Sequence, residues 1–177
     1  MKQILLSLLI LLLACQVVNA QEPSTPEIEW LSMEEALRRN EENPRKFLID
    51  IYTDWCGWCK KLDQTTFRDP NLVELVNRHF YAVKLDGEFQ GDILFQGKNY
   101  SFVKTGNRGY HALASMLMQG RNSYPTVAFL DETGKPIGPI PGYRDAKEMQ
   151  KVITYFAGEF YTFMDLPNFL KSYQLEE

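Results

Sequence analysis

The feature that most constrains the fold is a pair of cysteines, Cys56 and Cys59, that closely follows an apolar segment. This segment, residues 47–52, has the short, continuous apolar pattern of a strand buried on both faces. A helix that starts at Cys56 carries Cys59 one turn further along the same face, so the two thiols can form a disulfide and separate again. A strand, a short turn and a C-x-x-C helix start together indicate redox chemistry.

Cys56 is the candidate nucleophile because the amide N–H groups at a helix tip favour a thiolate. We expect an exposed Cys56 with a pKa below the free-cysteine value of about 8.5. Its thiolate would attack a substrate disulfide, and the more buried Cys59 would then resolve the mixed disulfide. A structural disulfide is the weaker alternative, because so short a loop restrains the unfolded chain little. Zinc would normally need four ligands. The two histidines, His79 and His111, are far from the motif in sequence, and His111 is expected at the surface, so no metal is predicted.

Residues 47–61 resemble the active-site stretch of the thioredoxin superfamily. The match includes a strand carboxylate (Asp50), a tryptophan before the first cysteine (Trp55), Cys-Gly-x-Cys, and the following Lys60. A second match is Ser123-Tyr124-Pro125-Thr126 before an apolar run, which is similar to the cis-proline loop of the superfamily. The resemblance covers about residues 30–160. The segment Phe67-Arg68-Asp69-Pro70 makes the chain most similar to extracytoplasmic thioredoxin-like proteins related to the C-terminal domain of the disulfide reductase DsbD.

The resemblance implies an α/β thioredoxin-like fold, with a central mixed sheet flanked by helices and an insertion before the cis-proline loop. It also implies that Asp50 relays the proton of Cys59 through water, that Pro125 is cis and faces the cysteines, and that Tyr124 shapes the substrate groove. The residues alone leave simpler alternatives open: Asp50 could face solvent at a strand edge, and Pro125 could be an ordinary trans proline.

Two tryptophans flank the first cysteine. An exposed Trp55 could bind apolar groups of a substrate, although it could instead pack beneath the helix tip. Trp58, between the cysteines at a helix start, has no room to pack inward, so we expect it to be exposed and to contact substrate. It carries no charge that would stabilise a thiolate, and this favours a reductant over an oxidant.

The first twenty residues have the pattern of a signal peptide, with Lys2, an apolar run over residues 4–13, and small residues before Ala20. Cleavage after Ala20 would remove Cys15. The alternative is a lipoprotein, because Leu12-Leu13-Ala14-Cys15 resembles a lipobox and would anchor the chain to a membrane through Cys15. Both alternatives place the protein outside the cytoplasm, periplasmic or secreted, where disulfides persist.

The charge balance gives no sign of a nucleic-acid partner. Lys2 is the only charged residue among the first twenty, so the remaining chain has 18 of the 19 basic residues and all 23 acidic ones, a net charge of −5. No block of like charge stands out. The predicted partners are protein disulfides and, as electron donor, a dithiol protein such as a membrane reductase; no bound cofactor is expected.

Along the chain, residues 21–29 are polar and are predicted to be a flexible leader, and residues 30–177 a single domain. Within it we expect an excursion or hairpin over about 87–107 and a C-terminal extension over about 161–177 that holds a short helix. The other predicted elements are a helix capped by Ser32 and Glu35, helices over 70–80, 110–120 and 149–160, and strands over 81–85, 126–131 and 136–140.

The sequence therefore predicts an extracytoplasmic thiol–disulfide oxidoreductase that works on protein substrates, with a reductant favoured. An oxidase or isomerase of folding proteins remains open, as does a redox-silent binding module that uses the groove around Pro125.

Overall fold

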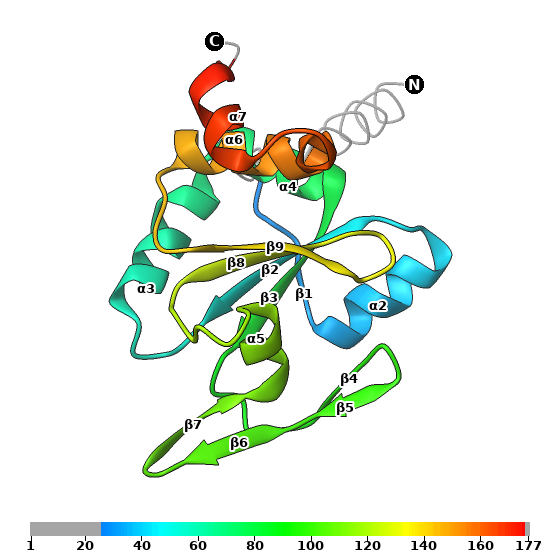
Figure 1. Ribbon diagram of the computed structural model, residues 1–177, viewed down its shortest axis with the longest axis vertical. Helices are drawn as coiled ribbons and strands as arrows, with labels where there is room; N and C mark the ends of the chain where they lie inside the picture. Colours follow the sequence, from blue (N-terminus) through cyan, green and yellow to red (C-terminus); the bar gives the residue numbers. More distant parts are fainter. Residues whose placement is uncertain (1–25, 176–177) are drawn as a thin grey trace, which may run out of the picture.

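The structure is a computed structural model that describes residues 26–175 (Figure 1). The predicted signal peptide with Cys15, and leader residues 21–25, lie outside the described residues. At the centre is a five-stranded mixed sheet in the order β1-β3-β2-β8-β9. Strand β2 (Lys46–Tyr52) pairs in parallel with β3 (Phe80–Asp86) and antiparallel with β8 (Thr126–Leu130). The edges are β1 (Trp30–Leu31) and β9 (Pro136–Pro141), which agrees with the edge position expected of a proline-containing strand.

Strand β2 is buried because helices cover both faces of the sheet. One face is covered by α3 (Gly57–Gln64), α4 (Pro70–His79), α6 (Ala146–Ala157) and α7 (Leu166–Ser172). The other is covered by α2 (Met33–Glu42) and α5 (Ala112–Leu117). Side chains alternate along a strand, so Leu48 and Asp50 point toward the α3 side, whereas Ile49 points toward α2 and α5. This architecture confirms the predicted fold class.

Four of the helices begin at side-chain caps that the sequence makes recognisable. Ser32, Asp69, Asp145 and Asp165 each accept a backbone N–H of the first turn, which satisfies a donor that would otherwise be unpaired. Two 3-10 turns, η1 (Thr66–Arg68) and η2 (Phe160–Thr162), follow α3 and α6. Phe80 and Phe160, which we expected inside helices, therefore lie in β3 and η2.

The insertion is larger and more regular than predicted. It consists of two hairpins, β4 (Ile93–Phe95) with β5 (Lys98–Tyr100), and β6 (Phe102–Thr105) with β7 (Arg108–His111). The helix expected from residue 110 therefore starts only at Ala112. In Figure 1 the hairpins lie together beyond α5, at the end of the molecule opposite α6 and α7.

Two further expectations are wrong. His111 is fully buried rather than at the surface: its backbone N–H donates to the Gly87 carbonyl at 2.7 Å, and its ring packs against Phe89. The leader does not extend to residue 29: the Glu29 N–H donates to Asn77 Oδ1 of α4 at 3.0 Å, and Asn77 donates to the Glu27 carbonyl at 2.9 Å. Among residues 26–175, no helix combines the length and apolar character needed to cross a membrane.

Candidate active site

Cys56 and Cys59 form a disulfide at the tip of α3, with their Cα atoms 5.3 Å apart. Cys56 is the N-cap residue, and its Sγ accepts the Cys59 N–H at 3.1 Å. The Cys56 N–H in turn donates to the Thr53 carbonyl at 3.1 Å, which fixes the turn between β2 and α3. The predicted strand, turn and helix start are therefore present, and the sulfur of Cys56 lies beside a backbone donor at the helix tip.

The exposure of Cys56 differs from the prediction. In the disulfide form its exposed fraction is only 5%, against 2% for Cys59, so the expected order holds but the expected exposure does not. The reason is local: the disulfide and the contact with the Cys59 N–H both turn Sγ into the helix tip. A partner's sulfur can therefore approach Cys56 only over a small area.

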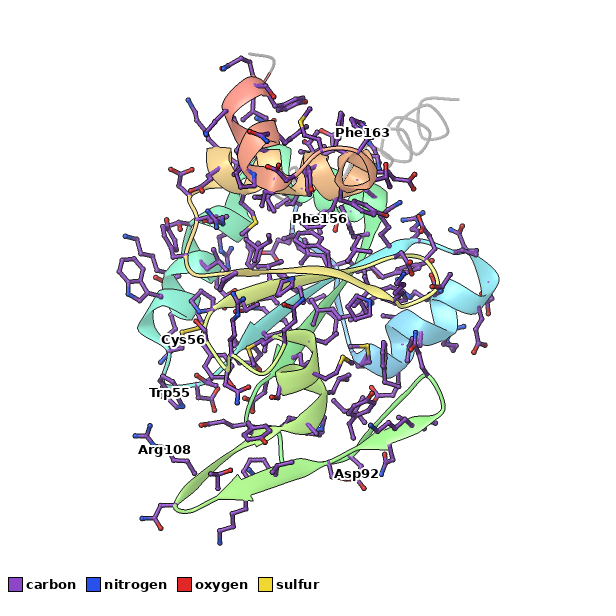
Figure 2. The ribbon with its side chains drawn as sticks, viewed as in Figure 1. Trp55, Cys56, Asp92, Arg108, Phe156 and Phe163 are labelled. Atoms are coloured by element: carbon purple, nitrogen blue, oxygen red, sulfur yellow. A yellow bond between two sulfur atoms is a disulfide. The ribbon has the colours of Figure 1, made fainter. Side chains whose placement is uncertain are left out.

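The two flanking tryptophans are the exposed surface of the motif, at 62% for Trp55 and 57% for Trp58. The Trp55 ring meets Tyr124 edge to face at a centroid distance of 5.8 Å, and its Nε1 donates to Glu88 Oε2 at 3.0 Å. Trp55 is thus oriented by two contacts but is not packed beneath the helix. In Figure 2 it extends from the molecule next to Cys56.

Trp58 is held on the other side of the motif. Its ring packs on Tyr143 at a centroid distance of 5.3 Å, and the Lys61 ammonium lies 4.9 Å from the Trp58 centroid. Tyr143 follows β9 and was not predicted to belong to the site, because nothing in its local sequence indicates that it reaches α3.

The Tyr124–Pro125 peptide bond is cis, as predicted. Pro125 is buried, and its carbonyl accepts the Gly142 N–H at 2.8 Å. The Tyr124 ring crosses Gly87 so closely that a Cβ there would lie 2.4 Å from the ring. Together with the contact between Tyr124 and Trp55, this brings the cis-proline loop to the C-x-x-C motif.

Asp50 lies beneath α3 with an exposed fraction of 1%, so the alternative of a solvent-facing carboxylate is wrong. Its Oδ2 accepts a hydrogen bond from Lys84 Nζ at 2.6 Å. Burial raises the pKa of Asp50 to about 6, even though the Lys84 ammonium opposes this rise. A carboxyl group with this pKa can accept and release a proton near neutral pH.

Lys84 and Asp63 belong to the same network, and sequence reasoning missed both. Lys84 is the register partner of Asp50 on β3, and its ammonium also contacts the carboxylate of Asp63. Asp63 comes four residues after Cys59 on α3, which puts the two on the same side of the helix. Burial lowers the pKa of Lys84, but the two carboxylates outweigh burial and the net shift is upward, so Lys84 stays cationic. A lysine inside the apolar strand over 81–85 was the available signal.

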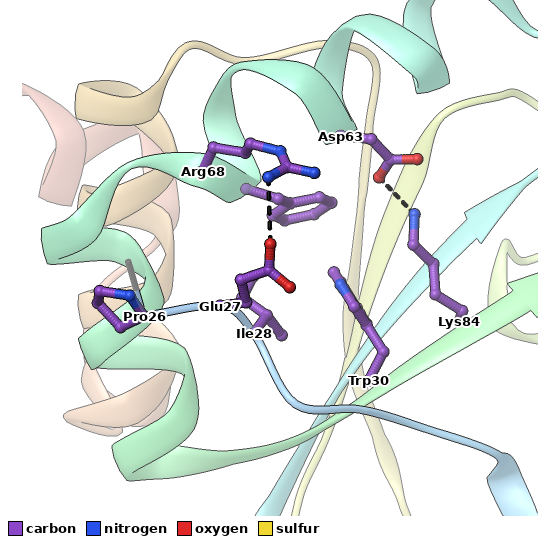
Figure 3. A pocket seen from close by; sticks show the side chains of 8 residues that line it. Pro26, Glu27, Ile28, Trp30, Asp63, Arg68 and Lys84 are labelled. Atoms are coloured by element: carbon purple, nitrogen blue, oxygen red, sulfur yellow. Dashed lines mark hydrogen bonds and ion pairs between the residues drawn. The ribbon is translucent and has the colours of Figure 1, made fainter. Parts of the chain in front are cut away.

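A pocket of about 290 Å³ connects this network with solvent (Figure 3). Lys84 and Asp63 face each other on one side of it, and Trp30 stands between them and Ile28. On the other side Arg68 pairs with Glu27 at 3.1 Å. The Asp50 network therefore opens to solvent through a pocket that neither Trp55 nor Trp58 lines. Among residues 26–175, no three His, Cys, Asp or Glu side chains are grouped to hold a metal ion.

Comparison with known proteins agrees with this geometry. The family model of the thioredoxin-like domain matches residues 33–157. The chain belongs to the thioredoxin-like domain family. The disulfide between Cys56 and Cys59 lies within the matched residues and is the kind of group that thiol–disulfide exchange requires.

Two relatives and one solved structure illustrate the similarity. The thiol:disulfide interchange protein DsbD of Pectobacterium atrosepticum is 29% identical over 119 residues, which is 66% of this chain but only 17% of that protein. The disulfide bond reductase DsbH of Chlamydia pneumoniae is 22% identical, over 62% of this chain and 60% of that protein. A thioredoxin-fold protein from Helicobacter pylori superposes with a TM-score of 0.55 at 19% identity, over 73% of this chain and 79% of that one, and shares the fold.

Proposed function

We propose that the protein is an exported disulfide reductase that passes electrons from a partner dithiol to disulfides in other proteins. The observation that carries the proposal is the disulfide at the tip of α3, next to two exposed indoles and above a buried carboxyl group whose pKa is about 6. Export is supported by the signal-peptide pattern of residues 1–20.

The first step is attack by the Cys56 thiolate on one sulfur of a substrate disulfide. A bond forms between Cys56 Sγ and that sulfur, the substrate S–S bond breaks, and the other substrate sulfur leaves with the electron pair and takes up a proton. The N–H of Cys59, which contacts Cys56 Sγ at 3.1 Å, would stabilise negative charge on the attacking sulfur.

The second step releases the reduced substrate. Cys59 loses its proton, and its thiolate attacks Cys56 Sγ; the mixed disulfide breaks, and the substrate sulfur leaves and is protonated. The protein ends as the disulfide described here. We assign the proton of Cys59 to Asp50, because Asp50 is buried on the α3 side of the sheet and has a pKa near neutrality.

Substrate would lie across the surface formed by Trp55, Trp58, Tyr124 and Pro125. The exposed rings of the two tryptophans offer apolar area without a large loss of side-chain freedom, since each is already fixed by contacts. Pro125 has no N–H, so an extended substrate segment would pair with the backbone groups beside it.

The reducing direction rests on Trp58. An imidazolium at this place would stabilise the reduced form of Cys56 and make the protein more oxidising, whereas an indole carries no charge. The name of the Chlamydia relative, a disulfide bond reductase, agrees with this direction. Each turnover leaves the protein oxidised, so two electrons must come from another dithiol, and we propose a membrane reductase of the DsbD kind.

The test is reduction of insulin with dithiothreitol as electron source. We expect turnover by the wild type and none by Cys56→Ser, because a hydroxyl group in place of the thiol cannot form the mixed disulfide. Cys59→Ser should keep the first step and lose the second, so that it accumulates substrates as mixed disulfides that can be identified by mass spectrometry. Capture of nothing by Cys59→Ser, with no insulin reduction by the wild type, would favour a redox-silent binding module.

The reduction potential decides the direction. A value near that of thioredoxin, about −270 mV, agrees with a reductant, and a value near about −120 mV would instead indicate an oxidase.

A further inference from the structure

A groove of about 770 Å³ runs from the active site to the inserted β6–β7 hairpin. We call it the hairpin groove, and the residues that matter for its chemistry are Trp55, Glu88, Phe102, Lys104, Asn107 and Arg108. Trp55 precedes Cys56 in the chain, so the groove begins one residue from the reactive sulfur. Figure 2 shows Arg108 extending from the hairpin on the side of the molecule where Trp55 and Cys56 lie.

The wall of the groove has a fixed shape. Phe102 lies across Gly109, where a Cβ would be only 2.1 Å from the Phe102 ring. Lys104 is the register partner of Gly109, and it projects to the same face of β6 as Phe102 because alternate residues share a face. This face therefore carries an aromatic ring and an ammonium group side by side.

The charge of the groove is opposite to that of the protein. Lys104 and Arg108 are exposed, and within residues 26–175 neither has a carboxylate in salt-bridge contact. Glu88, the carboxylate that also lines the groove, accepts the Trp55 indole N–H. Among the described residues, the groove is lined by two cations without an ion-pair partner and by one carboxylate, so its formal charge is positive on a chain whose net charge is −4.

We propose that the hairpin groove binds an acidic, extended segment of the substrate protein next to the cysteine that meets Cys56. This inference rests on the proposed function. Carboxylates of the segment contact Lys104 and Arg108, while its apolar side chains contact Trp55 and Phe102. Strand β6 has four residues and so spans about 13 Å, enough to contact a comparable length of an extended segment.

The test compares two disulfide-linked peptides of the same length and aromatic content, one with acidic residues and one with lysines around the cysteine. At low salt we expect wild-type kcat/KM to be about tenfold higher for the acidic peptide, and high salt to remove the difference. In Lys104→Glu/Arg108→Glu the preference should reverse, because attraction is replaced by repulsion.

The matched control is Lys147→Glu/Lys151→Glu, with the same change in net charge on α6 at the opposite end of the molecule. It should keep the preference of the wild type; an equal shift in both variants would mean that only net charge matters and would overturn the proposal. Reduction of a small neutral disulfide reports whether the active site of Lys104→Glu/Arg108→Glu is intact. If that variant fails to fold, Lys104→Gln/Arg108→Gln takes its place, and it should lose the preference without reversing it. Equal wild-type rates for both peptides would refute acidic binding in the hairpin groove and leave the proposed function standing. Failure to reduce any disulfide would refute the proposed function.

Discussion

At the scale of single residues, two kinds of contact build the site. Cys56 and Cys59 are paired within one local motif beside the exposed Trp58, and Pro125 supplies the cis peptide bond of a second motif. The sequence indicated each of these features, and only the low exposure of Cys56 differs. The partners of Asp50 were not predictable in the same way, because Lys84 reaches Asp50 only through the register of β2 and β3. Contacts between residues far apart in sequence need the fold, not the motif.

The buried carboxyl group of Asp50 makes stability depend on pH. Its folded pKa of about 6 lies above the usual 3.8, so the folded state loses stability as pH rises through about 6. We expect Asp50→Asn to stabilise the oxidised protein at pH 8 by about 2–3 kcal/mol, since one pKa unit corresponds to about 1.4 kcal/mol. The gain should shrink as pH falls toward 4. Urea unfolding across this range measures it.

A control variant and a second measurement separate this effect from a general change in stability. Asp54→Asn changes an exposed carboxylate of the same turn and should alter the free energy of unfolding by less than about 0.5 kcal/mol. Asp50→Asn should also slow resolution of the mixed disulfide in stopped-flow experiments. A gain in stability that is the same at every pH would contradict the assigned titration.

At the scale of elements, the helices and core strands followed from caps and apolar periodicity, but the insertion did not. Its hairpins have two-residue loops, Gln96 with Gly97 and Gly106 with Asn107. Both residues of the first loop have positive φ, at 51° and 73°, as a tight hairpin turn requires. The glycines indicated turns, yet the strands are only three or four residues long and carry too little periodicity to fix their partners.

The contact between Gly87 and the cis-proline loop gives a test at this scale. A methyl group at residue 87 would collide with the Tyr124 ring, so Gly87→Ala should cost about 1–3 kcal/mol of unfolding free energy. In a Tyr124→Ala background the ring is absent, and the same substitution should cost much less. A double-mutant cycle by urea unfolding should therefore give a coupling of at least about 1 kcal/mol. Additive effects would mean that Tyr124 does not rest on Gly87 in solution.

At the scale of the whole molecule, the resemblance predicted the mixed sheet and the position of the active site, since both follow from the order of a few elements. It did not predict the roles of the two segments added to this fold, the inserted hairpins and the C-terminal extension. The hairpins extend the active-site end, while η2 and α7 cover α6 at the other end (Figure 1). In Figure 2 Phe163 lies at this second end, away from Cys56. Because the two added segments lie at opposite ends, the hairpins can affect substrate recognition while α7 affects the stability of the fold.

This separation predicts that α7 contributes to stability and not to catalysis. Phe169 of α7 is 2% exposed and stacks on Tyr173 with a centroid distance of 4.7 Å. Phe169→Ala should therefore lower the free energy of unfolding by about 3–5 kcal/mol, the usual cost of removing a buried phenylalanine. The matched control is Phe163→Ala, because Phe163 is 71% exposed and its loss should cost less than about 0.5 kcal/mol. Below the unfolding transition both variants should reduce insulin at the wild-type rate, and a slower rate for folded Phe169→Ala would show instead that the C-terminal extension supports the active site.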